Sequence, residues 1–174
     1  HHAPSSTLHN RRVARVIAVA NQKGGVAKTT TAITLAAALA DTGHAVLVID
    51  LDAQACATFS LGIDPEDLPP QTVDFLLDDL PASQGAARMR SAIRTTDEGF
   101  SLLPATLSLA SADVSLADRP ARERTLSRVL DEIRDTFDVI VIDCSPSLGL
   151  TTINALVAAA DVLVPFQCET LSHR

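Results

Sequence analysis

The sequence predicts an α/β fold in which helices flank a mostly parallel central sheet. Short apolar runs rich in β-branched residues occur at residues 16–20, 45–49 and 139–142, and such runs are typical of strands buried on both faces of a parallel sheet. Longer apolar segments with the length of helices separate them. The first strand, a glycine turn, a helix and the second strand form a βαβ unit, which favours parallel pairing.

The ordered domain is expected over residues 15–174. Residues 1–14 are polar and begin with two histidines, which we interpret as a purification-tag remnant followed by a flexible arm. No internal repeat or low-complexity linker divides the rest of the chain, so one domain accounts for it.

The N-terminal elements are the most clearly patterned. Residues 16–20 (VIAVA) predict a buried strand, and glycines interrupt the pattern soon afterwards. The Ala-rich residues 29–40 predict a helix that is packed on most of its surface, and Gly43 is placed to end it. Residues 45–49 (AVLVI) predict the second strand.

The later elements follow the same two patterns. Proline and acidic residues at 64–71 predict a loop. Apolar runs predict strands at residues 100–103, 139–142 and 162–164. Helices are predicted at residues 73–80, 84–94, 106–112, 121–134 and 148–159.

A phosphate-binding loop is predicted between the first strand and the first helix, at residues 23–30 (KGGVAKTT). Gly24 and Gly25 let successive backbone N–H groups point at one anion, and the following helix adds its N-terminal dipole. Lys28 can reach the β- and γ-phosphates, and the Thr29 hydroxyl can bind Mg²⁺. The predicted nucleotide-binding residues are Lys23, Gly24, Gly25, Val26, Ala27, Lys28, Thr29 and Thr30.

The strict pattern GxxxxGK[ST] is not met, because Gln22 and Ala27 stand where it requires glycine. What remains is KGGxxK[ST], with Lys23 five residues before Lys28. The alternative is an ordinary glycine turn between a strand and a helix. The two lysines, the threonines and the flanking strand and helix together favour the phosphate loop.

Three aspartates are expected beside this loop. Asp50 and Asp52 follow the second strand, and Asp143 follows the strand at residues 139–142. Ligands of open α/β sheets bind at the carboxyl ends of the strands, where these side chains lie if the strands are neighbours. Asp143 has the position of a magnesium-holding carboxylate. Helix capping or a plain surface position remains the alternative for Asp50 and Asp52.

The loop KGGVAKTT resembles the deviant Walker A loop of the ParA/MinD ATPases, and other segments extend the resemblance over residues 13–172. DLDAQ at residues 50–54 resembles the family's DxDPQ, with Ala53 in place of proline. LPA at 103–105, DCSPSLG at 143–149 and VPFQCE at 164–169 resemble further family segments. The resemblance implies a three-layer P-loop NTPase fold and the ligands ATP or ADP and Mg²⁺.

The resemblance also implies residue roles. Lys23 crosses a dimer interface to the partner's ATP, Lys28 binds phosphate, and Asp52 positions or activates the attacking water. The implied catalytic residues are Lys23, Lys28 and Asp52. The implied metal-binding residues are Thr29, Asp50 and Asp143.

The function implied by the resemblance is an ATP-hydrolysing partition ATPase for chromosome or plasmid segregation. It would act as an ATP-dependent homodimer on non-specific DNA, with a centromere-binding ParB-like partner, in the cytoplasm and on the nucleoid. Family members are longer, and the C-terminal part that the resemblance expects beyond residue 172 is missing. That part supplies most adenine contacts and much of the DNA surface in the family.

Three alternatives stay open. The first is a shortened ParA-like protein that binds nucleotide without turnover. The second is a MinD-like membrane-associated ATPase, which needs a C-terminal amphipathic helix that this sequence does not show. The third is a reductase of the nitrogenase iron-protein type, which needs two cysteine segments around a shared cluster. Cys144 has no second cysteine between it and Cys56.

Composition narrows the class of protein further. A net charge of −7 does not indicate a basic nucleic-acid binder, and solvated helix faces are favoured over a basic patch. No apolar run approaches the length that spans a bilayer, so no membrane partner is expected.

The widely spaced cysteines indicate neither a zinc site nor a disulfide framework, which fits a reducing cytosol. The cysteines are Cys56, Cys144 and Cys168. The arginine clusters are Arg88, Arg90 and Arg94, and Arg119, Arg122, Arg124 and Arg128.

Overall fold

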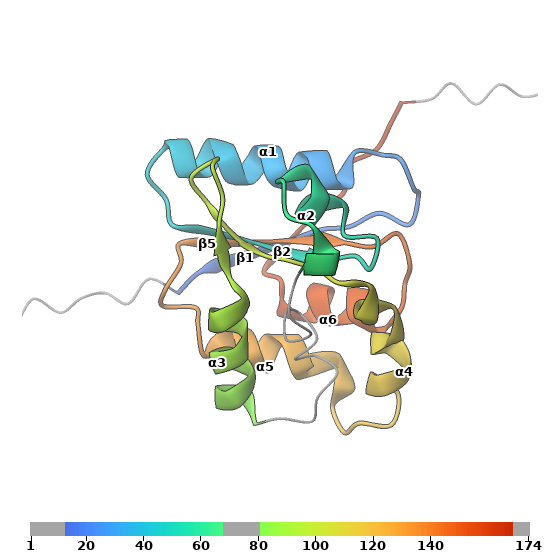
Figure 1. Ribbon diagram of the computed structural model, residues 1–174. Helices are drawn as coiled ribbons and strands as arrows, with labels where there is room; N and C mark the ends of the chain where they lie inside the picture. The colour runs from blue at the N-terminus through green and yellow to red at the C-terminus, as the bar shows by residue number, and fades with distance from the viewer. Residues whose placement is uncertain (1–12, 68–80, 169–174) are drawn as a thin grey trace, which may run out of the picture.

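One twisted sheet forms the middle of the molecule (Figure 1). The structure is a computed structural model, and it describes residues 13–67 and 81–168. Within those residues the sheet has six strands in the order β3-β4-β2-β5-β1-β6. The strands are β1 (Arg15–Val19), β2 (Val46–Leu51), β3 (Arg94–Thr95), β4 (Ser101–Leu103), β5 (Val139–Cys144) and β6 (Asp161–Leu163).

The described strands pair in parallel, except for β3, which forms an antiparallel hairpin with β4. The five strands predicted from apolar runs are confirmed, with ends shifted by one or two residues. β3 was not predicted, because two residues are too few to show a strand pattern.

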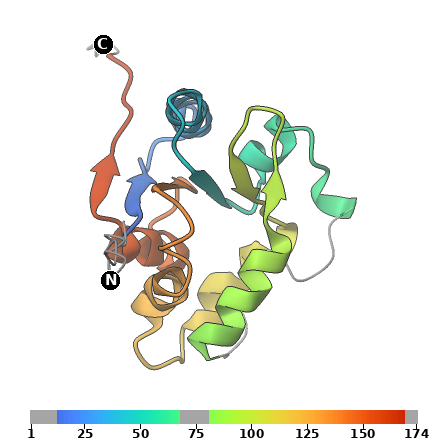
Figure 2. The same ribbon diagram turned by 90° about the vertical axis from the view of Figure 1, so that its left-hand side faces the viewer.

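Helices cover both faces of the sheet and make it a three-layer structure (Figures 1 and 2). One face carries α1 (Lys28–Asp41), and the opposite face carries α3 (Ala82–Ala92), α5 (Thr125–Asp131) and α6 (Leu150–Ala158). Each face has its own apolar core: Ala32 and Ala36 of α1 pack in one, and Met89 and Leu130 pack in the other. The predicted α/β fold is confirmed.

The two central strands hold the site in place. All six residues of β2 and all six of β5 are buried. Burial of a Val, Leu or Ile side chain contributes roughly 1.5–3 kcal/mol of transfer free energy. Asp50 and Asp143, which lie within these strands, and Asp52, which directly follows β2, are therefore held by the most deeply buried part of the sheet.

Some predicted elements differ from those observed. The helix predicted at residues 106–112 is wrong: a 3₁₀ helix occupies Leu107–Ser111, and α4 follows at Ala112–Leu116. The apolar spacing there reflects burial of Leu109 and Leu116 in a tighter, interrupted path, with Leu107 and Val114 exposed. The helix predicted at 121–134 is a 3₁₀ turn, Arg122–Arg124, followed by α5.

Other segments were either missed or lie outside the described residues. The short helix α2 (Cys56–Ser60) and the 3₁₀ turn Pro65–Asp67 were not predicted, because one turn leaves no periodic pattern. The predicted helix at residues 73–80 and the predicted arm, apart from residues 13 and 14, fall outside the described residues. None of the helices in the described part of the chain has the length and apolarity that crossing a bilayer requires.

Candidate functional site

The predicted phosphate loop connects β1 to α1 and lies at the carboxyl ends of the parallel strands (Figure 1). Gly25, at φ 72°, and Ala27, at φ 61°, both have left-handed backbone conformations that curl the chain. The hydrogen bonds of the described residues leave the backbone N–H groups of residues 24–27 without a protein acceptor. A curled run of unpaired N–H groups at a helix N-terminus is suited to bind an anion.

Ala27 adopts a backbone conformation that residues other than glycine rarely adopt. The left-handed region costs a residue with a Cβ about 1–2 kcal/mol. We therefore expect Ala27→Gly to raise the free energy of unfolding by about 1 kcal/mol, measured by chemical denaturation. The matched control is Ala38→Gly, at an exposed position of α1, which should lower stability by about 1 kcal/mol. A loss of stability in both variants would contradict the strain at Ala27.

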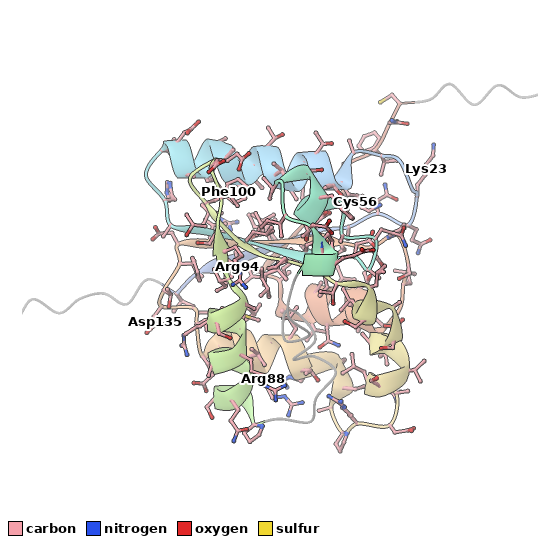
Figure 3. All side chains as sticks on the ribbon, viewed as in Figure 1. Lys23, Cys56, Arg88, Arg94, Phe100 and Asp135 are labelled. Carbon is pink, nitrogen blue, oxygen red and sulfur yellow. The ribbon has the colours of Figure 1, made fainter. Side chains whose placement is uncertain are left out.

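The two lysines of the loop have different surroundings. Lys28 is buried, and its Nζ donates to the Lys23 carbonyl oxygen at 3.2 Å, across the curl of the loop. The Lys23 side chain projects outward from the edge of the molecule (Figure 3). Lys28 therefore lies where it can meet an anion bound in its own loop, whereas Lys23 lies where it can meet another molecule.

A segment after β6 supports the loop through contacts that the sequence did not predict. Asn21 Nδ2 donates to the Pro165 carbonyl at 2.7 Å, and its Oδ1 accepts from the Lys23 backbone N–H at 2.9 Å. Gln167 Nε2 donates to the Gly25 carbonyl at 3.3 Å. The VPFQCE resemblance marked this segment but gave no indication that it contacts the phosphate loop.

The strand register brings the aspartates to the loop. Asp50 and Asp143 are direct partners across β2 and β5, and Val19, the last residue of β1, is the partner of Asp143 on the other side. The neighbouring strands that the prediction required are therefore present. Asp52 follows one residue after β2 and is partly buried.

Asp143 is the most unusual of these carboxylates. It is 1% exposed, and both of its carboxylate oxygens lie buried without a hydrogen bond of regular geometry. Burial raises its pKa from 3.8 to about 7, with Asp50 and Asp52 adding to the rise, while the Thr29 hydroxyl and the Lys28 ammonium oppose it. A buried carboxylate without donors is costly unless a cation or a proton neutralises it.

Asp50 is fully buried, but its oxygens are occupied. Oδ2 accepts from the backbone N–H and the hydroxyl of Thr58, at 2.9 and 2.7 Å, and Oδ1 accepts from the Asp52 N–H at 3.2 Å. Burial raises the pKa of Asp50 to about 6, against these hydrogen bonds. Thr58 lies in the first turn of α2, so Asp50 also caps that helix. Asp52 Oδ1 accepts from the Gln54 N–H at 3.0 Å.

Because Asp50 and Asp143 are buried carboxylates, we expect the free energy of unfolding to fall as pH rises. Their folded pKa values of about 6 and about 7 lie above the unfolded value of 3.8. Between pH 4 and 7 the folded state therefore binds more protons than the unfolded state, and the free energy of unfolding decreases with pH.

We expect Asp143→Asn to remove most of this decrease and to raise stability at pH 8 by on the order of a few kcal/mol. Denaturant unfolding between pH 4.5 and 8, without nucleotide or divalent cation, measures it. Parallel pH profiles of the two proteins would contradict the assignment.

Thr29 and Asp143 fit a magnesium ion that also binds nucleotide. Within residues 13–67 and 81–168, no group of three or more His, Cys, Asp or Glu side chains could hold a metal by itself. Mg²⁺ in nucleotide sites uses one or two protein oxygens and takes the rest from phosphates and water. The two unpartnered oxygens of Asp143, near the Thr29 hydroxyl, match that requirement.

Other candidate residues have structural explanations. Asn154 is buried: its Oδ1 accepts from the Leu126 N–H at 3.0 Å, and its Nδ2 donates to the Arg122 and Leu150 carbonyls. It thus caps α5 and makes no contact with the phosphate loop. Cys144 is buried, and burial raises its pKa to about 12, so it is not exposed to share a cluster with another chain.

Several of the clustered arginines donate to main-chain carbonyls near helix ends, which fits their interpretation as solvated helix faces. These arginines are Arg90, Arg94, Arg122 and Arg128.

Known proteins resemble this chain in sequence. A family described as an AAA domain matches residues 14–174. The Bacillus subtilis protein named sporulation initiation inhibitor protein Soj is 45% identical over 156 residues, covering 89% of this chain and 59% of that protein. The Myxococcus xanthus protein named chromosome partitioning protein ParA is 42% identical over 158 residues, covering 90% and 53%. The chain is a ParA/Soj-type member of the AAA domain family. It spans little more than half the length of these relatives.

Solved structures agree with the P-loop NTPase fold, and one of them is a partition protein. A Borrelia burgdorferi plasmid partition protein matches with a TM-score of 0.73 at 28% identity, covering 91% of this chain and 68% of that one. A Mycobacterium smegmatis protein named cobyrinic acid a,c-diamide synthase, solved with an ATP analogue and magnesium, matches with a TM-score of 0.83 at 53% identity. That match covers 93% of this chain and 64% of the other.

Proposed function

We propose that this ParA/Soj-type chain binds ATP with Mg²⁺ and hydrolyses it, as the nucleotide-handling part of a partition ATPase for chromosomes or plasmids. The observation that carries the proposal is Asp143, a buried carboxylate with two unpartnered oxygens beside a loop of unpaired N–H groups. A bound Mg²⁺–phosphate group supplies partners for both sets of atoms. The relatives named Soj and ParA support the partition role.

Each residue of the site has a proposed part. The N–H groups of residues 24–27 and the Lys28 ammonium bind the β- and γ-phosphates. Thr29 and Asp143 hold Mg²⁺, which supplies positive charge against the phosphate oxygens when bound. Asp50, whose oxygens are already occupied by Thr58 and Asp52, supports the site from the second strand. Asp52 orients the attacking water.

Lys23 is proposed to act on a second copy of the chain. A cation that arrives in trans at the phosphates stabilises the charge of the transition state, as an arginine finger does. The outward projection of Lys23 supports this part (Figure 3). In the whole protein the ATP-bound dimer would bind DNA non-specifically and respond to a ParB-like partner, in the cytoplasm and on the nucleoid.

The experiment is phosphate release by this chain at saturating Mg-ATP over a wide range of protein concentrations. If Lys23 acts in trans, turnover per chain should rise with concentration, and Lys23→Ala should lower the plateau by roughly tenfold or more. Turnover per chain that is independent of concentration and equal in Lys23→Ala would contradict the trans role. The absence of any release would leave nucleotide binding without turnover as the function.

A second candidate is ATP-dependent amide formation, favoured by the 53% identity to the protein named cobyrinic acid a,c-diamide synthase. ATP consumption with a carboxylate substrate and ammonia distinguishes the two. ATP turnover that depends on cobyrinic acid and is unaffected by DNA would favour the synthase. Turnover that proceeds without that substrate and responds to DNA would favour partition.

A further inference from the structure

The N-terminus of α6 is capped by a carboxylate from another helix. The residue that precedes α6, Gly149, has no side chain with which to cap it. Asp113, in the first turn of α4, takes this part: its Oδ1 accepts from the Thr151 backbone N–H at 2.8 Å and from the Thr151 hydroxyl at 2.7 Å. A carboxylate at a helix N-terminus pairs with free N–H groups and with the positive end of the helix dipole.

The absence of a side chain at Gly149 leaves room for the Asp113 carboxylate. A Cβ at Gly149 would overlap the Asp113 carboxylate. The φ of Gly149, −69°, is open to any residue, so glycine is required here for space rather than for conformation. The carboxylate and the glycine together fix how closely α4 and α6 approach each other.

This contact lies at one end of the loop that follows Asp143. We name residues 145–149 the β5–α6 loop: it starts two residues after Asp143 and ends at Gly149, beside Asp113. Within the loop, the Ser145 and Ser147 hydroxyls are 2.8 Å apart. β5 fixes the first end of the loop, and Asp113 fixes the second.

The stretch of chain between β4 and α4, which leads to Asp113, is also connected by hydrogen bonds to the carboxylates of the site. The Ala105 N–H, just after β4, donates to the Thr58 hydroxyl at 3.0 Å, and that hydroxyl in turn donates to Asp50. Asp113 also shares the lining of a cavity of about 120 Å³ with Asp52, and the other polar residues that line it come from the β5–α6 loop and the start of α6. These residues are Ser145, Ser147 and Thr151.

We propose that Asp113 is a positioning residue, which holds the β5–α6 loop, and with it the cavity that this loop shares with Asp52, in the arrangement that ATP turnover needs. Asp113 itself contacts no residue of the phosphate loop among its described hydrogen bonds. Its effect on turnover rests on the function proposed above, whereas its effect on the loop does not.

Hydrogen–deuterium exchange tests whether Asp113 restrains the β5–α6 loop. In Asp113→Ala, amides of residues 147–152 should exchange at least about fivefold faster than in the original chain, and those of α1 should be unchanged. Asp113→Asn keeps an oxygen that can accept from Thr151 and should restore much of the protection. Asp118→Ala, an exposed carboxylate nearby in sequence, is the control. Unchanged exchange at residues 147–152 in Asp113→Ala would overturn the proposal.

Steady-state kinetics tests the effect on turnover. Asp113→Ala should lower kcat by roughly tenfold and leave the KM for ATP within about twofold, because the phosphate loop is not touched. Gly149→Ala should lower kcat less in the Asp113→Ala background than alone, since the clash is then gone. Full kcat in Asp113→Ala, or purely additive effects, would overturn the positioning role. If the original chain releases no phosphate, the proposed function fails, and exchange alone decides whether Asp113 holds the loop.

Discussion

Lys28→Ala should reduce ATP turnover by roughly a thousandfold, because it removes the buried cation that meets the β- and γ-phosphates. Lys28 begins α1 and donates into the curl of its own loop, which is where the proposed phosphate groups bind. Phosphate release at saturating Mg-ATP measures the loss.

The matched control is Thr34→Ala, an exposed position later in α1, which should keep the original rate. Far-ultraviolet circular dichroism and denaturant unfolding establish that both variants are folded. If Lys28→Ala hydrolyses ATP at the original rate while remaining folded, the phosphate loop is not the catalytic site.

Asp143→Asn should lower Mg²⁺-dependent turnover by roughly a hundredfold or more. The substitution keeps the shape of the side chain but removes the charge whose oxygens have no protein partner. The same substitution should raise the stability of the nucleotide-free protein at pH 8, as argued above, because it removes a buried charge. Activity and stability should therefore change in opposite directions.

Asp135→Asn is the control for Asp143→Asn. Asp135 is exposed and lies at the end of the molecule opposite to Lys23 (Figure 3), so its neutralisation should alter neither quantity. Loss of activity together with loss of stability in Asp143→Asn would indicate that Asp143 is a structural residue of the sheet rather than a metal ligand.

The sequence could predict those parts of the site that depend on local patterns. The strands β1, β2 and β5 are continuous apolar runs, and the loop between β1 and α1 has its lysines and glycines within eight residues. Asp143 was predictable because it follows directly on the apolar run at residues 139–142, and the observed β5 extends over it to Cys144. The register of β5 between β1 and β2 then places it beside the loop.

The supporting residues could not be predicted, because their partners lie far away in the sequence. Asp113 caps a helix 38 residues further on, and Asn21 contacts Pro165, 144 residues away. Thr58 lies in a helix of five residues, which is too short to leave a periodic signal. Contacts of this kind arise from how the elements pack, and a single sequence does not state which elements are neighbours.

The most direct test is calorimetric titration of this chain with a non-hydrolysable ATP analogue, with and without Mg²⁺. The site described here predicts saturable binding that Mg²⁺ strengthens, that Lys28→Ala abolishes and that Asp143→Asn makes insensitive to Mg²⁺. Binding of equal affinity in the original chain and in Lys28→Ala, or no binding by the folded original chain, would contradict a nucleotide–magnesium site between the β1–α1 loop and Asp143.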